Sequence, residues 1–285
     1  NTMDALTSGS GNIAMGKHAF GSATIGVCNV AIGFGAMTDV TTGQADKNIA
    51  IGNSALLGSA STSGNDNVAI GSSSAAALTS GACNIAMGLN ALGAATTGSQ
   101  NIGIGQTALG GADTTGARNI AIGTYAMDAL TSGACNVAIG NGALGFSLTG
   151  STNVAIGNLA LGGSNTTGAD NIAIGNAAAD ALTSGACNIA LGINALGAAT
   201  IGNRNIAIGE AAMSGVTTGA ANHNIAIGLS ALVGAAGTTG NSNIAIGEET
   251  MDALTTGCKN VAIGCNALGA ATTACNNVAI GRGVM

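Results

Sequence analysis

The sequence has no proline and no tryptophan, and aromatic residues make up only 1% of its 285 residues. Globular cores normally draw much of their buried area from aromatic rings. The core of this chain is therefore expected to be thin and lined by aliphatic side chains.

Charged residues are also scarce, at 6% of the chain, and only six of them are Lys or Arg. A nucleic-acid surface needs clustered basic residues, so six scattered ones exclude it. No run of about twenty apolar residues occurs, and no membrane span is expected. The chain also lacks the clustered acids and aromatic clefts of many β-solenoid enzymes. We therefore expect no enzyme, with no catalytic, cofactor-binding or metal-binding residue.

What the sequence does contain is a repeated five-residue motif, Asn-Ile-Ala-Ile-Gly. Every copy keeps the Asn and the closing Gly, and its second and fourth residues are always Ile, Val, Met or Leu. Successive copies start 17, 18 or 19 residues apart, a fixed period that predicts a protein growing along one axis. The Asn of the sixteen copies stands at 12, 29, 48, 67, 84, 101, 119, 136, 153, 171, 188, 205, 224, 243, 260 and 277.

Each repeat unit, counted from its Asn, reads as two short extended segments and a corner. The alternation of aliphatic with small or polar residues over the motif predicts a half-buried strand. Ala at the eighth position and Leu or Met at the ninth predict a second, shorter strand or extended segment. The unit closes on Thr-Thr-Gly or Thr-Ser-Gly, as at Thr79-Ser80-Gly81, where Gly permits a sharp corner.

Helix and disorder are the two competing interpretations. Ala and Leu favour helix, but each unit carries at least two Gly at fixed places, and each costs about 1 kcal/mol in a helix interior. Glycine-rich chains of low complexity often stay disordered. Here the aliphatic residues recur at fixed positions and the net charge is only −6, so both interpretations are disfavoured.

The predicted fold is an all-β parallel β-solenoid, or β-roll, of about sixteen coils of 17–19 residues with two short strands each. Stacked coils lie about 4.8 Å apart. We expect the two Ile columns to form the core and the Asn residues to stack as a hydrogen-bonded ladder. Residues 1–285 are expected to form a single continuous solenoid domain, and the chain starts mid-repeat, as a window of a longer repetitive protein would.

The motif followed by Ala-Leu and Thr-Thr-Gly resembles two related kinds of repeat. One is found in the heads of trimeric autotransporter adhesins, whose repeats are similar to Asn-Ser-Val-Ala-Ile-Gly. The other is found in phage and giant-virus tail-fibre-like proteins. Both resemblances imply a parallel β-roll on an extracellular, cell or virion surface, often as a homotrimer. The units here are longer than those of the adhesin heads and add Thr-Thr-Gly.

Seven Cys are present, and most stand near the Asn. Cys28, Cys83, Cys135 and Cys187 directly precede an Asn, three coils apart, which is too far to bridge within one chain. They are expected to be small corner residues or to cross-link subunits. Cys258 and Cys275 precede Asn residues of adjacent coils by two positions. Their Cα atoms should lie near 5 Å apart, which is within disulfide reach. The sequence therefore allows either a disulfide or two free thiols at this pair.

The remaining polar residues give no clustered site. His18 and His223 are eleven or more coils apart, and no Cys-x-x-Cys pattern indicates zinc. A calcium ladder needs carboxylates in consecutive coils. The acids that share one repeat position are three or more coils apart: Asp4, Asp128, Asp180 and Asp252.

The sequence favours a structural function. We expect an extracellular or virion fibre, or an adhesin-like protein, whose flat, weakly charged surfaces let copies associate as a homotrimer or filament. The alternative is a binding module that uses one flat face for ice or for a cell-surface glycan or matrix component. Adjacent Thr side chains at the corner should point to opposite faces, which disfavours a two-column ice-binding face.

Overall fold

The computed structural model describes residues 2–3, 5–40, 45–58, 63–215, 221–234 and 239–284. The chain is all-β in these residues, and it forms the predicted parallel β-solenoid with a repeat of about 17 residues. Contacts divide it into two compact units, residues 1–149 and 150–285. A coil is here one motif Asn and the residues up to the next one.

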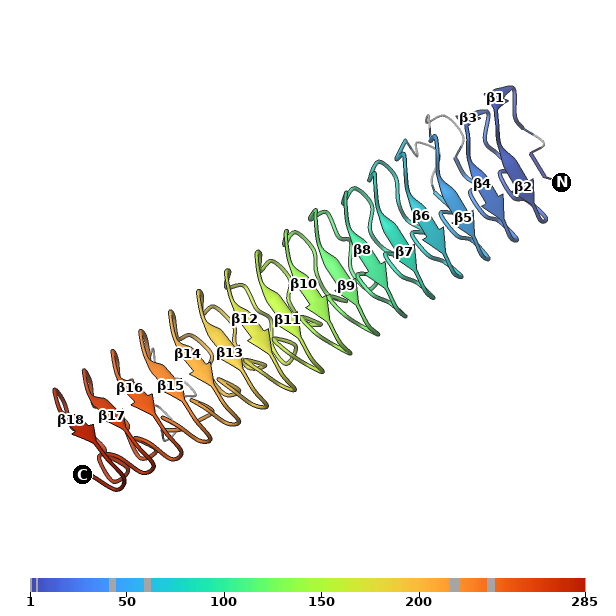
Figure 1. Ribbon diagram of the computed structural model, residues 1–285. Helices are drawn as coiled ribbons and strands as arrows, with labels where there is room; N and C mark the ends of the chain where they lie inside the picture. Colours follow the sequence, from blue (N-terminus) through green and yellow to red (C-terminus); the bar gives the residue numbers. More distant parts are fainter. Residues whose placement is uncertain are drawn as a thin grey trace. The chain divides into compact units, whose positions relative to one another are not determined.

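In the first unit, β2 and β4 to β10 follow one another in chain order as a parallel ladder, with each strand contributed by one motif (Figure 1). A separate short pairing joins β1 to β3 at the corner. The strands are β1 Ser8–Ser10, β2 Ile13–Met15, β3 Ile25–Val27, β4 Val30–Ile32, β5 Ile49–Ile51, β6 Val68–Ile70, β7 Ile85–Met87, β8 Ile102–Ile104, β9 Ile120–Ile122 and β10 Val137–Ile139.

The second unit repeats the arrangement with β11 to β18, each pairing in parallel with the next. The strands are β11 Val154–Ile156, β12 Ile172–Ile174, β13 Ile189–Leu191, β14 Ile206–Ile208, β15 Ile225–Ile227, β16 Ile244–Ile246, β17 Val261–Ile263 and β18 Val278–Ile280.

Pairing is in register throughout both ladders. Ala173 lies beside Ala190, and Ile172 lies beside Ile189. This in-register pairing is kept even where coils differ in length, because the extra residues fall in the corners rather than in the strand. Each motif position therefore forms a column of like residues, with neighbours about 4.8 Å apart.

The predicted second strand is wrong. The segment around the eighth and ninth positions forms a turn, because the seventh and ninth residues both take positive φ, as at Thr107 (55°) and Leu109 (53°). Alternating left-handed residues cannot make an extended strand. Their backbone groups still bond from coil to coil, since Leu92 N–H donates to Ala108 O at 2.9 Å.

The prediction that the Ile columns form the core is also wrong. Ala at the third motif position is buried throughout the described strands that carry it, apart from Ala14, whereas the Ile residues on either side reach solvent. Gly103 shows the reason, since a Cβ there would lie 3.2 Å from Leu92 Cδ1 and 2.9 Å from Ala108 O. The interior is narrow enough that only a small side chain fits opposite the ninth-position residue.

The true core consists of the motif Asn, Ala at the third and eighth positions, and the residues at the ninth and twelfth. Leu92 at the ninth position is paired with Ala95 at the twelfth, whereas Ala179 at the ninth is paired with Leu182 at the twelfth. One bulky aliphatic residue fills the interior of these two coils, whereas Met127 and Leu130 are both buried in another coil.

The Gly that closes the motif is fixed by contact with the next coil. Gly105 has a φ of 130°, and a Cβ placed on it would lie 2.6 Å from the carbonyl oxygen of Gly123. Any side chain would separate the two coils, which explains why this residue never varies.

Candidate functional site: an exposed aliphatic surface

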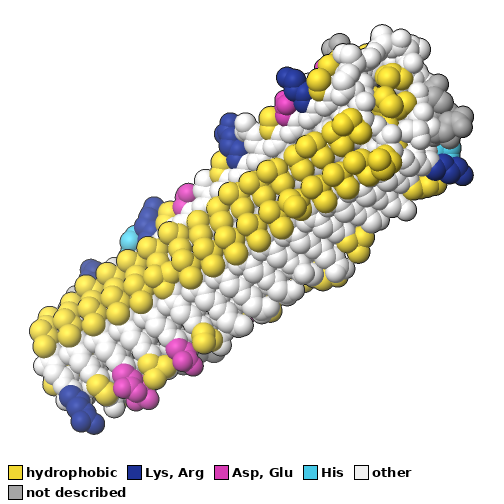
Figure 2. All heavy atoms as spheres, turned by 45° about the vertical axis from the view of Figure 1, so that its right-hand side comes forward, with side chains coloured by type: hydrophobic (Ala, Val, Ile, Leu, Met, Phe, Trp, Pro, Cys, Tyr) yellow, Lys and Arg dark blue, Asp and Glu magenta, His cyan; other side chains and the backbone are white. Residues whose placement is uncertain are grey.

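The most distinctive surface of each unit consists of aliphatic side chains that leave the strands outward. We call it the aliphatic surface, and define it as the first and third residues of β2 and β4 to β10 in the first unit and of β11 to β18 in the second. Within each unit, Figure 2 shows a hydrophobic band along the strands, bordered by polar side chains and backbone. Every position in it is Ile, Val, Met or Leu.

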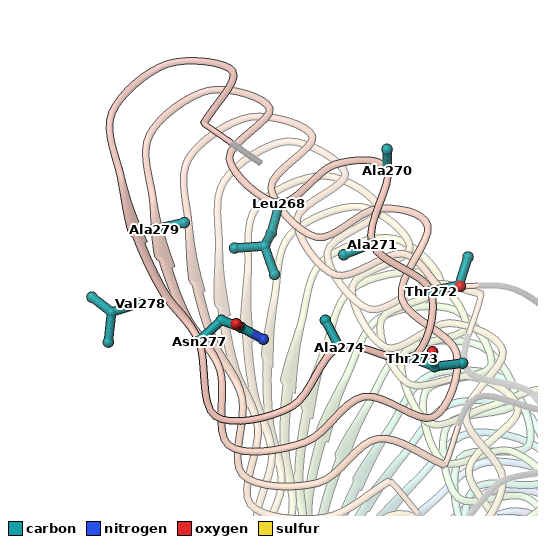
Figure 3. Close-up of a pocket in the computed structure, with 9 residues that line it drawn as sticks. All are labelled: Leu268, Ala270, Ala271, Thr272, Thr273, Ala274, Asn277, Val278 and Ala279. Atoms are coloured by element: carbon teal, nitrogen blue, oxygen red, sulfur yellow. The ribbon is translucent and has the colours of Figure 1, made fainter.

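Strand β12 shows how sharply inside and outside differ. Ile172 is 38% exposed and Ile174 is 40% exposed, while Ala173 between them is fully buried. In β18, Val278 points away from the coil, whereas Asn277 and Ala279 point into it (Figure 3). The alternation expected of a strand is present, but its larger apolar side chains face solvent.

The area of this surface in each unit is comparable to the largest apolar patches of monomeric proteins, which are often functional. Eight strands about 4.8 Å apart, each presenting two side chains across about 10 Å, give roughly 400 Å² per unit. Monomeric proteins rarely expose contiguous apolar patches beyond a few hundred Å². Each unit therefore offers an apolar patch of the size that is often an interaction site.

Two rims of more polar side chains flank the aliphatic surface. The leading rim is the residue before each motif Asn, and the trailing rim is the residue after each closing Gly. In the second unit, two of the three charged residues of the leading rim are basic, and two of the three of the trailing rim are acidic. The leading rim there carries Asp170, Arg204, His223 and Lys259, and the trailing rim carries Glu210, Glu248 and Arg282.

A buried ladder of Asn side chains aligns the strands that carry the aliphatic surface. Asn171 Oδ1 accepts hydrogen bonds from both the backbone N–H and the side-chain amide of Asn188, each at 3.0 Å. Asn171 Nδ2 donates to Asn153 Oδ1 at 3.1 Å and to the corner carbonyl of Gly185 at 2.9 Å. The predicted Asn ladder is confirmed, and it fixes both the spacing and the direction of each strand start.

The cysteines that precede an Asn lie on the leading rim. Cys28, Cys83, Cys135 and Cys187 are all exposed and take positive φ near 60°. Their place in the corner agrees with the prediction of corner residues, and their exposure leaves cross-linking between subunits as a prediction.

Cys258 and Cys275 are the one pair of cysteines that the structure brings together in its described residues. Their Sγ atoms are 3.0 Å apart, and the backbone N–H of Cys258 donates to Cys275 Sγ at 3.2 Å. The adjacency predicted from the repeat is confirmed, and both thiols are free.

The acids of the shared tenth position are partly buried. Burial raises the pKa of Asp128 and of Asp180 above the ordinary range, and backbone N–H donors only partly offset it. One carboxylate oxygen of Asp128 is buried without a hydrogen-bond partner among the described residues. Asp4, at the same repeat position, lies outside the described residues.

No larger chemical site is found where the structure can be described. Groups of three or more His, Cys, Asp or Glu that could hold a metal are absent from that part. His18 packs edge-on against Phe34 with ring centroids 5.9 Å apart. A hollow of about 400 Å³ in the last coil is lined mainly by Ala, Thr and Leu268, with Asn277 at its edge (Figure 3).

The third motif position, which lies between the two aliphatic positions, carried the sequence signal that these aliphatic residues face outward. The third motif position is Ala in fifteen copies and Gly103 in one, and it shares a strand face with the invariant Asn. A position restricted to the two smallest residues indicates close packing, whereas the flanking positions accept Ile, Val, Met or Leu.

The described residues include no helix of the length and apolarity needed to cross a membrane. Comparison of the chain with protein families, curated proteins and solved structures finds no match.

Proposed function

We propose that this chain is a structural protein whose copies associate through the aliphatic surface, forming a homotrimer or filament in an extracellular, cell-surface or virion fibre. The observation that carries the proposal is the unbroken pair of exposed aliphatic columns in each unit. Water contact with such an area is unfavourable by about 25 cal/mol per Å². A second copy that covers it removes that cost.

The chemistry of the surface favours a second copy over another kind of partner. Both columns consist of aliphatic residues alone, and they offer no charged or hydrogen-bonding side chain that could recognise a glycan or a peptide. A matching flat ladder with the same spacing of about 4.8 Å allows Ile side chains of two sheets to interdigitate. Only another solenoid of this kind offers that match along the whole length of a unit.

The rims of the second unit favour a parallel arrangement of the copies. If copies are related by an axis along the solenoid, the leading rim of one faces the trailing rim of the next. Arg204 and Glu210 flank the same strand, β14, and would then meet at the same height. Lys259 precedes β17 and Glu248 follows β16, so these two side chains would lie one strand apart in height. An antiparallel arrangement would place basic rim against basic rim.

The setting is proposed from the repeat itself. The resemblance to adhesin-head and tail-fibre repeats supports a place on a cell or virion surface. A nearly uncharged exterior, 6% charged residues in all, also leaves little repulsion to oppose lateral association.

The proposal is tested by placing charge in the aliphatic surface. In the variant Ile172→Lys/Ile174→Lys, both changed residues are exposed, so the coil should still fold. A matched control, Ser184→Lys/Thr256→Lys, adds the same charge at exposed corner positions. Mass photometry and sedimentation equilibrium measure the mass of each protein across a range of concentrations.

We expect the native chain and the control to have masses that are multiples of 26.6 kDa, and the strand variant to shift toward the single-chain mass. A native chain that stays at 26.6 kDa at every concentration would contradict the proposal. In that case, thermal hysteresis or glycan-array binding by the single chain would establish the alternative, a binding module for ice or glycan.

A further inference from the structure

We propose that Cys258 and Cys275 are a thiol–disulfide exchange site, in which Cys275 attacks a small disulfide and Cys258 resolves it, leaving a reversible cross-link between two neighbouring coils. The site is separate from the aliphatic surface and does not depend on association between copies.

The repeat places the two sulfurs together. Each Cys stands two residues before its motif Asn, and the strands that follow, β17 and β18, pair in register with Val261 beside Val278. The Sγ atoms lie 3.0 Å apart with the Cys258 thiol donating to Cys275. Cys275 is exposed and Cys258 is half-buried, so a small disulfide can reach Cys275.

Other coils show what this position normally does. Asn203, Asn222 and Asn241 occupy it in three successive coils. Each side-chain oxygen accepts the backbone N–H of the same position in the coil before, at 2.7 to 2.9 Å. In the last pair of coils the sulfur of Cys275 takes the acceptor's place and binds the Cys258 N–H at 3.2 Å. A built-in donor therefore points at the sulfur that must become negative.

The two thiols are not equivalent. Hydrogen bonds from the Cys258 thiol and backbone N–H lower the pKa of Cys275, while the thiol–thiol contact raises the pKa of Cys258. The positive charge of Lys259 favours both thiolates to a lesser extent. Of the two thiols, Cys275 therefore gives up its proton more readily, which identifies it as the first nucleophile.

The exchange balances with a low-molecular-weight disulfide, RSSR, as the oxidant. The Cys275 thiolate attacks one sulfur of RSSR, forms a mixed disulfide and releases RS⁻, which takes up the proton of Cys258. The Cys258 thiolate then attacks the Cys275 sulfur and releases the second RS⁻. Two protein thiols are oxidised to one disulfide, and RSSR is reduced to two RSH once the second thiolate is protonated.

Oxidised glutathione is the probe that tests this order. The native chain is incubated with it, alkylated, digested with trypsin without reduction, and mapped by mass spectrometry. We expect a cross-link between the peptide ending at Lys259 and the next one, with fragmentation placing the bond on Cys275 rather than Cys265. The Cys258→Ser variant should instead accumulate glutathione on Cys275, several-fold faster than Cys275→Ser accumulates it on Cys258.

A matched variant separates redox chemistry from simple folding. Cys275→Asn restores the acceptor found in neighbouring coils, so the Cys258 N–H should stay protected from hydrogen exchange in either redox state. In the native chain, oxidation should slow exchange of the β18 amides, and reduction should reverse it. Separate glutathione adducts on both cysteines, a bond to Cys265, or equal rates in the two Ser variants would overturn the proposal.

Discussion

A motif Asn such as Asn171 does the work of several hydrogen-bonding groups. Its side chain satisfies the backbone N–H and amide of the next Asn along the chain, the amide oxygen of the previous one and a corner carbonyl. No other side chain of this size carries both a donor and an acceptor in that arrangement. The identity of the residue follows from this geometry, and no binding role is needed to explain it.

Replacing one ladder Asn should loosen its coil locally. Asn171→Ala leaves the Asn188 N–H and the Gly185 carbonyl buried without partners, at about 1–3 kcal/mol for each orphaned group. We expect the Asn188 amide proton to exchange about a hundred times faster, as about 2.7 kcal/mol implies. The control Asn176→Ala removes an exposed side chain from the same coil. Equal exchange rates in both variants would contradict the ladder's role.

The half-buried acids should make stability depend on pH. Because the folded-state pKa of Asp128 and Asp180 is raised, their favourable contribution is present below the unfolded value of about 3.9 and is lost as pH rises through the folded value. Asp128→Asn/Asp180→Asn should therefore melt above the native chain at pH 7, and the difference should vanish in acid. Asp66→Asn, at an exposed position, is the control. A variant that melts lower at pH 7 would refute this account.

At the scale of the strand, three residues are enough to form a stable element, because the strands of neighbouring coils supply their hydrogen-bond partners. A three-residue strand is too short to persist alone, but each is bonded in register to the strands of adjacent coils. Stability in such arrays is a sum over repeats and their interfaces. Disturbances should therefore be felt in the nearest coils and read best by local probes.

Period and register were predictable from the sequence, whereas the direction of the side chains was not. The fixed Asn and Gly predicted the coil length, the parallel stacking and the Asn ladder. Alternation alone cannot say which face of a strand is inside, and the larger residues were assigned to the core. The narrow coil, filled by ninth-position residues such as Leu92, reverses that choice. The prediction of a second strand was wrong because the positive φ at positions such as Leu109 cannot be inferred from the residue type.

Substitutions in β12 distinguish the two assignments directly. Ala173→Ile should overpack the coil and destabilise it by about 1–3 kcal/mol, although it adds apolar surface. Ile174→Ala should have little effect on a dilute, unassociated chain, because its side chain is exposed. Hydrogen exchange of the β12 and β13 amides measures both. If Ile174→Ala were the more damaging change, the aliphatic residues would belong inside the coil.

For the whole molecule, the rims predict how copies are oriented. Arg204→Glu places two acids opposite each other in a parallel assembly and should weaken association a few-fold at low salt, since exposed pairs contribute less than about 1 kcal/mol. Adding Glu210→Arg should restore it by exchanging the charges. Sedimentation at two salt concentrations measures the effect. A double variant as weak as the single one would argue for antiparallel copies.

The central claim is that the outward Ile and Val columns are where copies of this chain meet. A side-chain-resolution density map of the assembled protein tests it most directly. We predict facing ladders of Ile and Val from different copies, with backbones about 10 Å apart and Ala and Asn inside every coil. A map in which these columns face solvent, or lie within the coil, would contradict the account.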